Sequence, residues 1–130
     1  MLRSVTPPQS RTASPRVYLL VMRHLIVAQD LAEIIRESEP EAEVLLAATA
    51  SAALETLSDV RTISVAFITT GPDEFAASAL KAAIAAREGR VVLMGDAAER
   101  YGENDSFAIL AQPFLPAKVT SLLMRMKTMG

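Results

Sequence analysis

The feature that most constrains the fold is an alternation between two apolar patterns, which begins at Val17 and runs nearly to the end of the chain. Short continuous apolar runs, such as Val17-Tyr-Leu-Leu-Val-Met22, are typical of strands buried on both faces. Longer segments with apolar residues at helical spacing separate these runs, as in 25–37, which Pro40 stops. The alternation predicts a parallel sheet with helices on both faces.

The predicted strands and helices follow one another in strict order. Strands are expected at 17–22, 42–48, 63–69, 90–94 and 107–111, and helices at 25–37, 49–58, 72–87, 96–101 and 116–127. Thr49 is expected to cap the second helix, Gly89 to end the third helix, and Pro113 to end the last strand. Five buried strands in this length predict a flavodoxin-like, doubly wound α/β fold with strand order 2-1-3-4-5.

The length of 130 residues fits one domain with a short tail. Hydrophobic residues make up 51% and aromatic residues 5%, so the core is expected to be aliphatic. Residues 1–16 are polar and proline-containing, and such a segment buries too little apolar surface to offset its ordering entropy. We therefore predict a flexible N-terminal tail at 1–16 and a single domain at 17–130.

Charge and cysteine content exclude several classes of function. The net charge of −2 provides no basic field for nucleic acid or an anionic membrane. The absence of Cys excludes disulfides, thiol catalysis and cysteine-ligated zinc, and it fits a reduced compartment. No apolar run approaches the ~18 residues that cross a bilayer, and prolines interrupt the N-terminus where a signal peptide would need an apolar run. We expect a soluble cytoplasmic protein with no nucleic-acid or membrane partner.

Three stretches of the sequence resemble the receiver domain of response regulators. They are the segment 25–35, the strand at 65–68 and the terminal run Leu110-Ala-Gln-Pro-Phe114. The last is the most specific, since receivers carry Lys-Pro-Phe at that point, and the whole resemblance extends over about 17–126. It implies a role in two-component signal transduction, and it implies that the Gln112–Pro113 peptide bond is cis.

The resemblance also indicates where receiver chemistry would lie. In that family two acids after the first strand hold Mg²⁺, and an aspartate at the end of the third strand takes the phosphoryl group. A hydroxyl and a lysine at the ends of the fourth and fifth strands bind the phosphoryl oxygens. Residue by residue, these positions fall on Met22 and Arg23, on Thr69, on Gly95 and on Gln112, and the aromatic switch position falls on Ile109.

None of these residues matches the family residue in chemistry. Mg²⁺ prefers hard oxygen ligands, which the Met22 thioether and the Arg23 guanidinium do not supply. Thr69 cannot form an acyl phosphate, and without metal or lysine nothing neutralises a transferring phosphoryl group. His24, the single histidine, is expected to be an exposed helix-start residue without a catalytic partner. We therefore expect no enzyme activity, no catalytic residue, no metal and no cofactor, and a pseudo-receiver that cannot be phosphorylated and acts through protein–protein interaction.

The strand ends also admit an alternative function. Arg23, Thr69 and Thr70, together with the start of the helix at 72, would suit an anion, because helix N-termini favour negative charge. The domain would then be a small-molecule or anion sensor with a repurposed pocket. The other interpretation of Arg23 is an internal ion pair with Asp73 or Asp96 that holds one conformation.

A partner surface is expected on the last strand and helix. In receivers, the face made by the fourth helix, the fifth strand and the fifth helix is the usual partner surface. The predicted interaction face here comprises Tyr101, Phe107, Ile109, Phe114, Lys118, Leu122 and Arg125. The expected partner is another signalling protein or a second copy of the chain. The alternative is that the aromatic side chains only pack locally.

Overall fold

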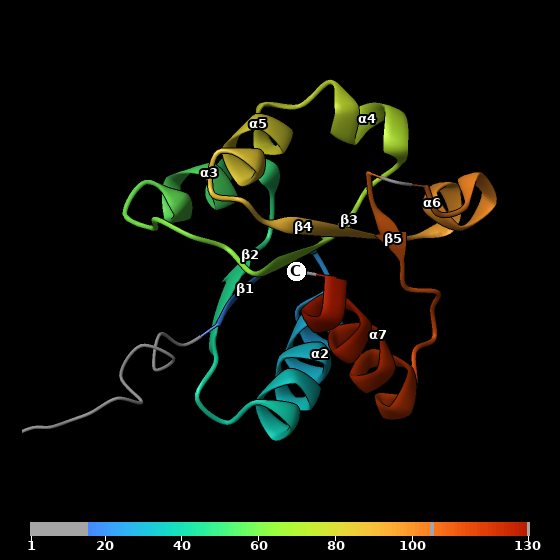
Figure 1. Ribbon diagram of the computed structural model, residues 1–130. Helices are drawn as coiled ribbons and strands as arrows, with labels where there is room; N and C mark the ends of the chain where they lie inside the picture. The colour runs from blue at the N-terminus through green and yellow to red at the C-terminus, as the bar shows by residue number, and fades with distance from the viewer. Residues whose placement is uncertain (1–15, 105, 130) are drawn as a thin grey trace, which may run out of the picture.

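The sheet has the predicted topology. The computed structural model describes residues 16–104 and 106–129, so all of the predicted tail at 1–16 except Arg16 lies outside the described residues. The strands are β1 (Val17–Val21), β2 (Glu43–Ala47), β3 (Val65–Thr69), β4 (Arg90–Met94) and β5 (Ala108–Ile109). They pair in parallel in the order β2-β1-β3-β4-β5 (Figure 1), which confirms the predicted flavodoxin-like fold.

The helices form one layer on each face of the sheet. On one face lie α2 (Leu25–Ser38) and α7 (Pro116–Met129), and on the other lie α3 (Ala50–Leu57), α4 (Pro72–Ala76), α5 (Ala79–Ala85) and α6 (Asp96–Tyr101) (Figure 1). Side chains of successive strand residues point alternately toward the two helix layers. Tyr18 and Leu20 of β1 pack toward α2 and α7, whereas Leu19 and Val21 pack toward the other layer. This alternation explains why the strands read as continuous apolar runs.

Two predicted elements differ from the structure. The single helix expected at 72–87 is interrupted between α4 and α5, because Ser78 adopts an extended backbone. The Ser78 hydroxyl and amide both donate to the Phe75 carbonyl, at 2.8 and 3.0 Å, which offers the backbone an alternative to continuing the helix. The strand expected at 107–111 pairs with β4 only at Ala108 and Ile109.

The end of α5 depends on close packing at Gly89. Glu88 has a φ of 60°, and the Gly89 amide donates to the Ile84 carbonyl at 3.0 Å. A Cβ atom at Gly89 would lie 2.8 Å from Ile84 Cγ2 and 3.0 Å from Ile63 Cγ2. Glycine is therefore required here because α5 and the segment before β3 approach each other closely.

One arginine joins α5 to the end of α3. Arg87 donates to the backbone carbonyls of Val60, Ala83 and Leu57, at 2.8, 2.7 and 2.8 Å respectively. The Leu57 carbonyl belongs to the last residue of α3, where helical carbonyls have no partner within their own helix. Arg87 therefore caps α3 from a different part of the chain.

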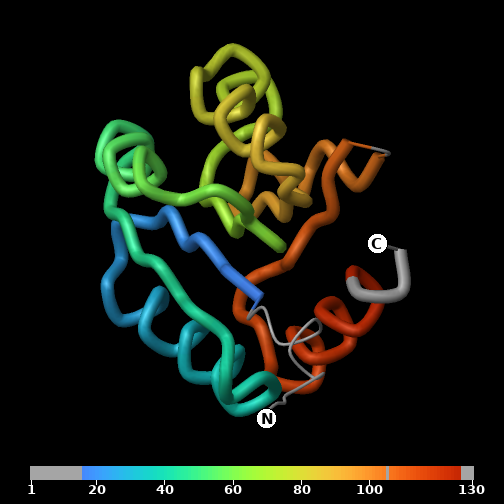
Figure 2. The backbone as a smooth tube through the Cα atoms, turned by 60° about the vertical axis from the view of Figure 1, so that its left-hand side comes forward, coloured from blue at the N-terminus to red at the C-terminus, as the bar shows by residue number. Residues whose placement is uncertain are grey.

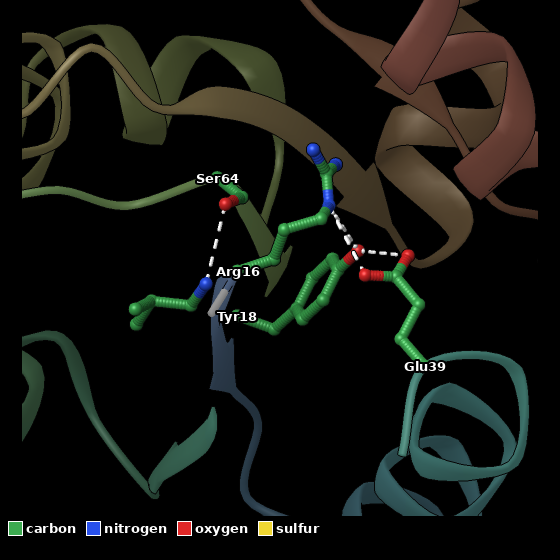
Figure 3. A network of polar contacts seen from close by, with 5 residues as sticks. Arg16, Tyr18, Glu39 and Ser64 are labelled. Atoms are coloured by element: carbon green, nitrogen blue, oxygen red, sulfur yellow. Dashed lines mark hydrogen bonds and ion pairs between the residues drawn. The ribbon is translucent and has the colours of Figure 1, made fainter. Parts of the chain in front are cut away.

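A polar network fixes the point where the chain enters the sheet (Figure 3). The Tyr18 hydroxyl donates to Glu39 Oε2 at 2.6 Å and accepts from Arg16 Nε at 2.9 Å, and Arg16 Nε lies 3.2 Å from Glu39 Oε1. The Val17 amide donates to Ser64 Oγ at 3.2 Å. Burial, with the neighbouring Glu39 carboxylate second, raises the pKa of Tyr18 to about 12. Arg16, predicted as the last tail residue, is thus attached to the domain.

Candidate functional site

The positions that correspond to receiver chemistry lie at the carboxyl edge of the sheet. Because the strands are parallel, their carboxyl ends meet at one edge. Thr69 and Gly95 are adjacent there, since a Cβ atom at Gly95 would lie 3.5 Å from Thr69 Cγ2. The Gln112 amide donates to Glu99 Oε2 at 3.1 Å, and the Gln112–Pro113 bond is cis, as the resemblance implies.

Met22 belongs to the core and not to an open site. Its side chain is 5% exposed and packs in the cluster between the sheet and the α2–α7 layer. Its amide donates to the Ala47 carbonyl at 3.0 Å, which continues the β1–β2 ladder by one residue. Within residues 16–104 and 106–129, no group of three or more His, Asp or Glu side chains is arranged to hold a metal ion.

A pocket of about 410 Å³ opens beside the ends of β1, β2 and β3. It brings together Arg23, Thr69 and Thr70, the residues predicted to suit an anion, and its wall includes the exposed His24. Sequence reasoning missed Glu74, which also lines this pocket and accepts a 3.4 Å hydrogen bond from Thr70 Oγ1. The pocket therefore carries both signs of charge.

One electrostatic expectation for this edge is wrong, and the expected anion binding stays a prediction. Within the described part of the chain, no ion pair joins Arg23 to Asp73 or Asp96, so Arg23 is not locked internally. The helix that was expected to attract an anion, α4, is only five residues long and carries Asp73 and Glu74 in its first turn. Those carboxylates oppose the positive end of the helix dipole, so α4 gives an anion little support.

The aromatic part of the predicted interaction face lies where α6 meets β5. The Tyr101 side chain is 60% exposed, and its ring centroid lies 5.8 Å from that of Phe107 with an interplanar angle of 48°. Phe107 and Ile109 are half-buried against the layer that contains α6. The rings thus pack locally, Tyr101 still faces solvent, and the predicted partner contact stays a prediction.

The helical part of the face comes from α7 and the loop before it. Lys118 is exposed, and Phe114 is half-buried against the core beneath α7. Leu122 is only 6% exposed and belongs to that core, so its inclusion as a surface contact is wrong. Leu122 lies on the apolar side of α7 and packs the helix against the sheet, so it positions the exposed residues of α7 without being exposed itself.

Side chains from α6 and the loop after it bind backbone amides of β5 and of the residues on either side of it. The amides of Phe107, Ile109 and Gln112 donate to Asn104 Oδ1, Glu103 Oε2 and Glu99 Oε2, at 3.1, 3.2 and 3.1 Å. Arg125 of α7 forms a 3.0 Å ion pair with the same Glu103 oxygen. The Ile109 amide, and after it Arg125, lowers the pKa of Glu103. These capped amides are closed to a further strand.

The fold is similar to that of a response regulator receiver domain protein from Bacillus halodurans C-125, with a TM-score of 0.66. The superposition covers 87% of this chain and 97% of the other, at 15% sequence identity. At that identity the likeness establishes the fold. No protein-family model matches the sequence, and no curated protein is significantly similar to it. None of the described helices is both long and apolar enough to span a membrane.

Proposed function

We propose that this chain is a receiver-like signalling domain that is not phosphorylated and that acts through protein–protein contacts. The observation that carries the proposal is the replacement of every group that would handle phosphate at the carboxyl edge of the sheet. Met22 is part of the core, Arg23 is a cation where an acid would hold Mg²⁺, and Thr69 faces Gly95, which has no hydroxyl. Phosphoryl transfer depends on charge neutralisation that these groups do not provide.

Phosphorylation is tested with acetyl phosphate and Mg²⁺, followed by intact-mass measurement, and with beryllium fluoride and Mg²⁺ followed by NMR. We expect no covalent adduct and no shift of the Thr69 or Gly95 amides. A competent receiver domain in the same reaction shows that the reagents are active. A Mg²⁺-dependent adduct, or shifts centred on Thr69, would refute the proposal.

The proposed docking surface is the exposed part of the α6–β5–α7 face. Tyr101 offers an exposed aromatic ring, a side chain enriched at protein interfaces, and Lys118 offers an exposed cation. Affinity capture from source-cell lysate with mass spectrometry should recover a recurrent partner, and Tyr101→Ala with Lys118→Glu should abolish its capture. The control is Glu33→Ala, an exposed position on α2, on which capture should not depend. Equal capture by both variants would place docking elsewhere.

A second candidate function is a small-molecule sensor, and the 410 Å³ pocket is the observation that favours it. Its Arg23 guanidinium makes no ion pair within the described residues. A ligand at 100 times its dissociation constant would stabilise the fold by about 2.7 kcal/mol. A thermal-shift screen of phosphorylated and carboxylate metabolites should find such a compound, and Arg23→Ala should lose the shift. A screen without any shift would exclude the sensor function and leave only the proposed role in protein–protein contacts.

A further inference from the structure

The opposite edge of the sheet, β2, is built differently from β5. The Glu43 amide donates to the Arg16 carbonyl at 2.9 Å, and the Ala47 carbonyl accepts from Met22 at 3.0 Å. These groups point toward β1. Because backbone groups alternate along a strand, the amides and carbonyls of Val44 and Leu46 point away from the sheet.

Nothing in the described part of the chain caps these outward groups. No side chain there donates to or accepts from the backbone of Val44 or Leu46, whereas side chains cap the Ile109 amide of β5 and the amides of Phe107 and Gln112 beside it. Figure 2 shows β2 on the outside of the fold, beyond β1. An uncapped edge strand is a template for pairing with another strand.

The surface beside this edge is apolar in the middle. Leu46 is 40% exposed and Leu25, at the start of α2, is 60% exposed. Both line a hollow of about 290 Å³ on the α2 side, together with Ala28. Large apolar side chains gathered beside an open strand edge indicate a contact surface.

The two ends of the edge carry opposite charges. Glu43 is exposed at the start of β2, and Arg23 is exposed at the other end, where it lines the same hollow beside Ala47. Neither side chain forms an ion pair within the described residues. A strand edge that is acidic at one end and basic at the other is complementary to itself when the second copy runs antiparallel.

We propose that two copies of this chain pair through β2, antiparallel, around a two-fold axis at Leu45, and so form one continuous sheet. This register sets Val44 opposite the partner's Leu46, and the two such pairs exchange about four N–H···O bonds. A register shifted toward the start of β2 loses bonds because the Ala42 amide is already bonded to the Glu39 carbonyl. The proposal is independent of the α6–β5–α7 face.

The proposed register also pairs apolar side chains with apolar ones and opposite charges with each other. Val44 and Leu46 both project toward the α2 side, since Val44 packs on that core and Leu46 lines the hollow. Directly opposite residues of an antiparallel pair lie on the same face, so each Leu46 covers the partner's Val44. Glu43 lies opposite the partner's Ala47, which brings it near the partner's Arg23.

Cysteine cross-linking tests the register, because the chain contains no native cysteine. Leu45 would face the partner's Leu45 as a non-hydrogen-bonded pair with Cα atoms about 4.5 Å apart, which is within disulfide range. Leu45→Cys should give a covalent dimer under mild oxidation. Met124→Cys, on the exposed side of α7, should remain monomeric. A monomeric Leu45→Cys protein, or preferential cross-linking of Met124→Cys, would overturn the proposal.

A charge exchange tests the ends of the edge, with mass measured by light scattering after size exclusion. Glu43→Arg and Arg23→Glu should each raise the dimer dissociation constant about tenfold, since each creates two like-charge contacts. The double variant should restore dimerisation, and thermal melts confirm that all variants fold. A monomeric wild-type chain at every soluble concentration overturns the proposal. So does a dimer that appears only after removal of residues 1–15, since that segment would then occupy the edge.

Discussion

Replacing Tyr18 with Phe tests how the entry network stabilises the fold. The change keeps the buried ring and removes only the oxygen that joins Arg16 to Glu39. A hydrogen bond to a charged group contributes about 1.5–3 kcal/mol. The side chains of Arg16 and Glu39 are 31% and 13% exposed and lie 3.2 Å apart. In the variant they keep their ion pair, and water can replace part of the lost hydrogen bonding. We therefore expect a loss of about 1.5–2 kcal/mol at pH 7, at the lower part of that range.

The loss should depend on pH with a defined sign. Burial raises the pKa of Tyr18 from 10.0 to about 12, so folding favours the neutral phenol. That contribution is complete below pH 10 and is lost as the pH rises from about 10 to about 12. A pKa difference of about 2 corresponds to at most about 2.7 kcal/mol, and partial exposure of Arg16 reduces this to about 1–2 kcal/mol.

Urea unfolding of the wild type and Tyr18→Phe at pH 7 and across pH 9–12 measures both effects. For a domain of this size the neutral-pH loss corresponds to a melting shift of about 4–8 °C. The advantage of the wild type should shrink as the pH rises above 10. The control is Tyr101→Phe, whose ring is exposed and which should change neither quantity. Equal stability at pH 7, or parallel curves through the alkaline range, would refute the reasoning.

Three further changes address other contacts. Arg87→Met should cost about 2–3 kcal/mol in denaturant unfolding, because three backbone carbonyls lose a charged donor. Gly89→Ala should cost about 1–3 kcal/mol in the same assay, since the new methyl group would meet Ile84 Cγ2 at 2.8 Å. Glu103→Gln should lower the melting temperature at pH 7. Its effect should vanish as the pH falls through the acid range, because the Ile109 amide lowers the pKa of the wild-type carboxyl. An unchanged difference at every pH would contradict this.

The parallel α/β architecture could be predicted from the sequence because it follows from local periodicity, and the strand order followed from the number of strands that this length allows. Each buried strand is an apolar run, and each long helix presents one apolar side, so the alternation predicts a parallel sheet covered by helices. The Thr49 cap was predictable for the same reason, and its hydroxyl accepts from the Ala52 amide at 3.1 Å. The edge where Thr69 and Gly95 meet follows directly from the parallel topology.

Contacts between distant segments could not be predicted in this way. From the sequence alone, Arg87 would be an ordinary charged residue at the end of a helix. Only the fold places it against the end of α3. The break at Ser78 falls inside an alanine-rich stretch whose propensity favours a continuous helix, and a local serine bond overrides that preference. Glu74 is an ordinary helix-start acid in sequence, and its place in the pocket depends on how α4 is oriented.

The burial of Met22 has a consequence for the mutational paths open to this protein. Its side chain is 5% exposed among aliphatic neighbours under α2 and α7. Replacing it with Asp would place an unpaired carboxylate in an apolar layer, at a cost of several kcal/mol, comparable with the whole stability of a small domain. Such an acid would first require changes in the surrounding helices. Packing at this one position therefore opposes single substitutions toward a metal-binding edge. A variant with an acid here would unfold before it could show any new activity.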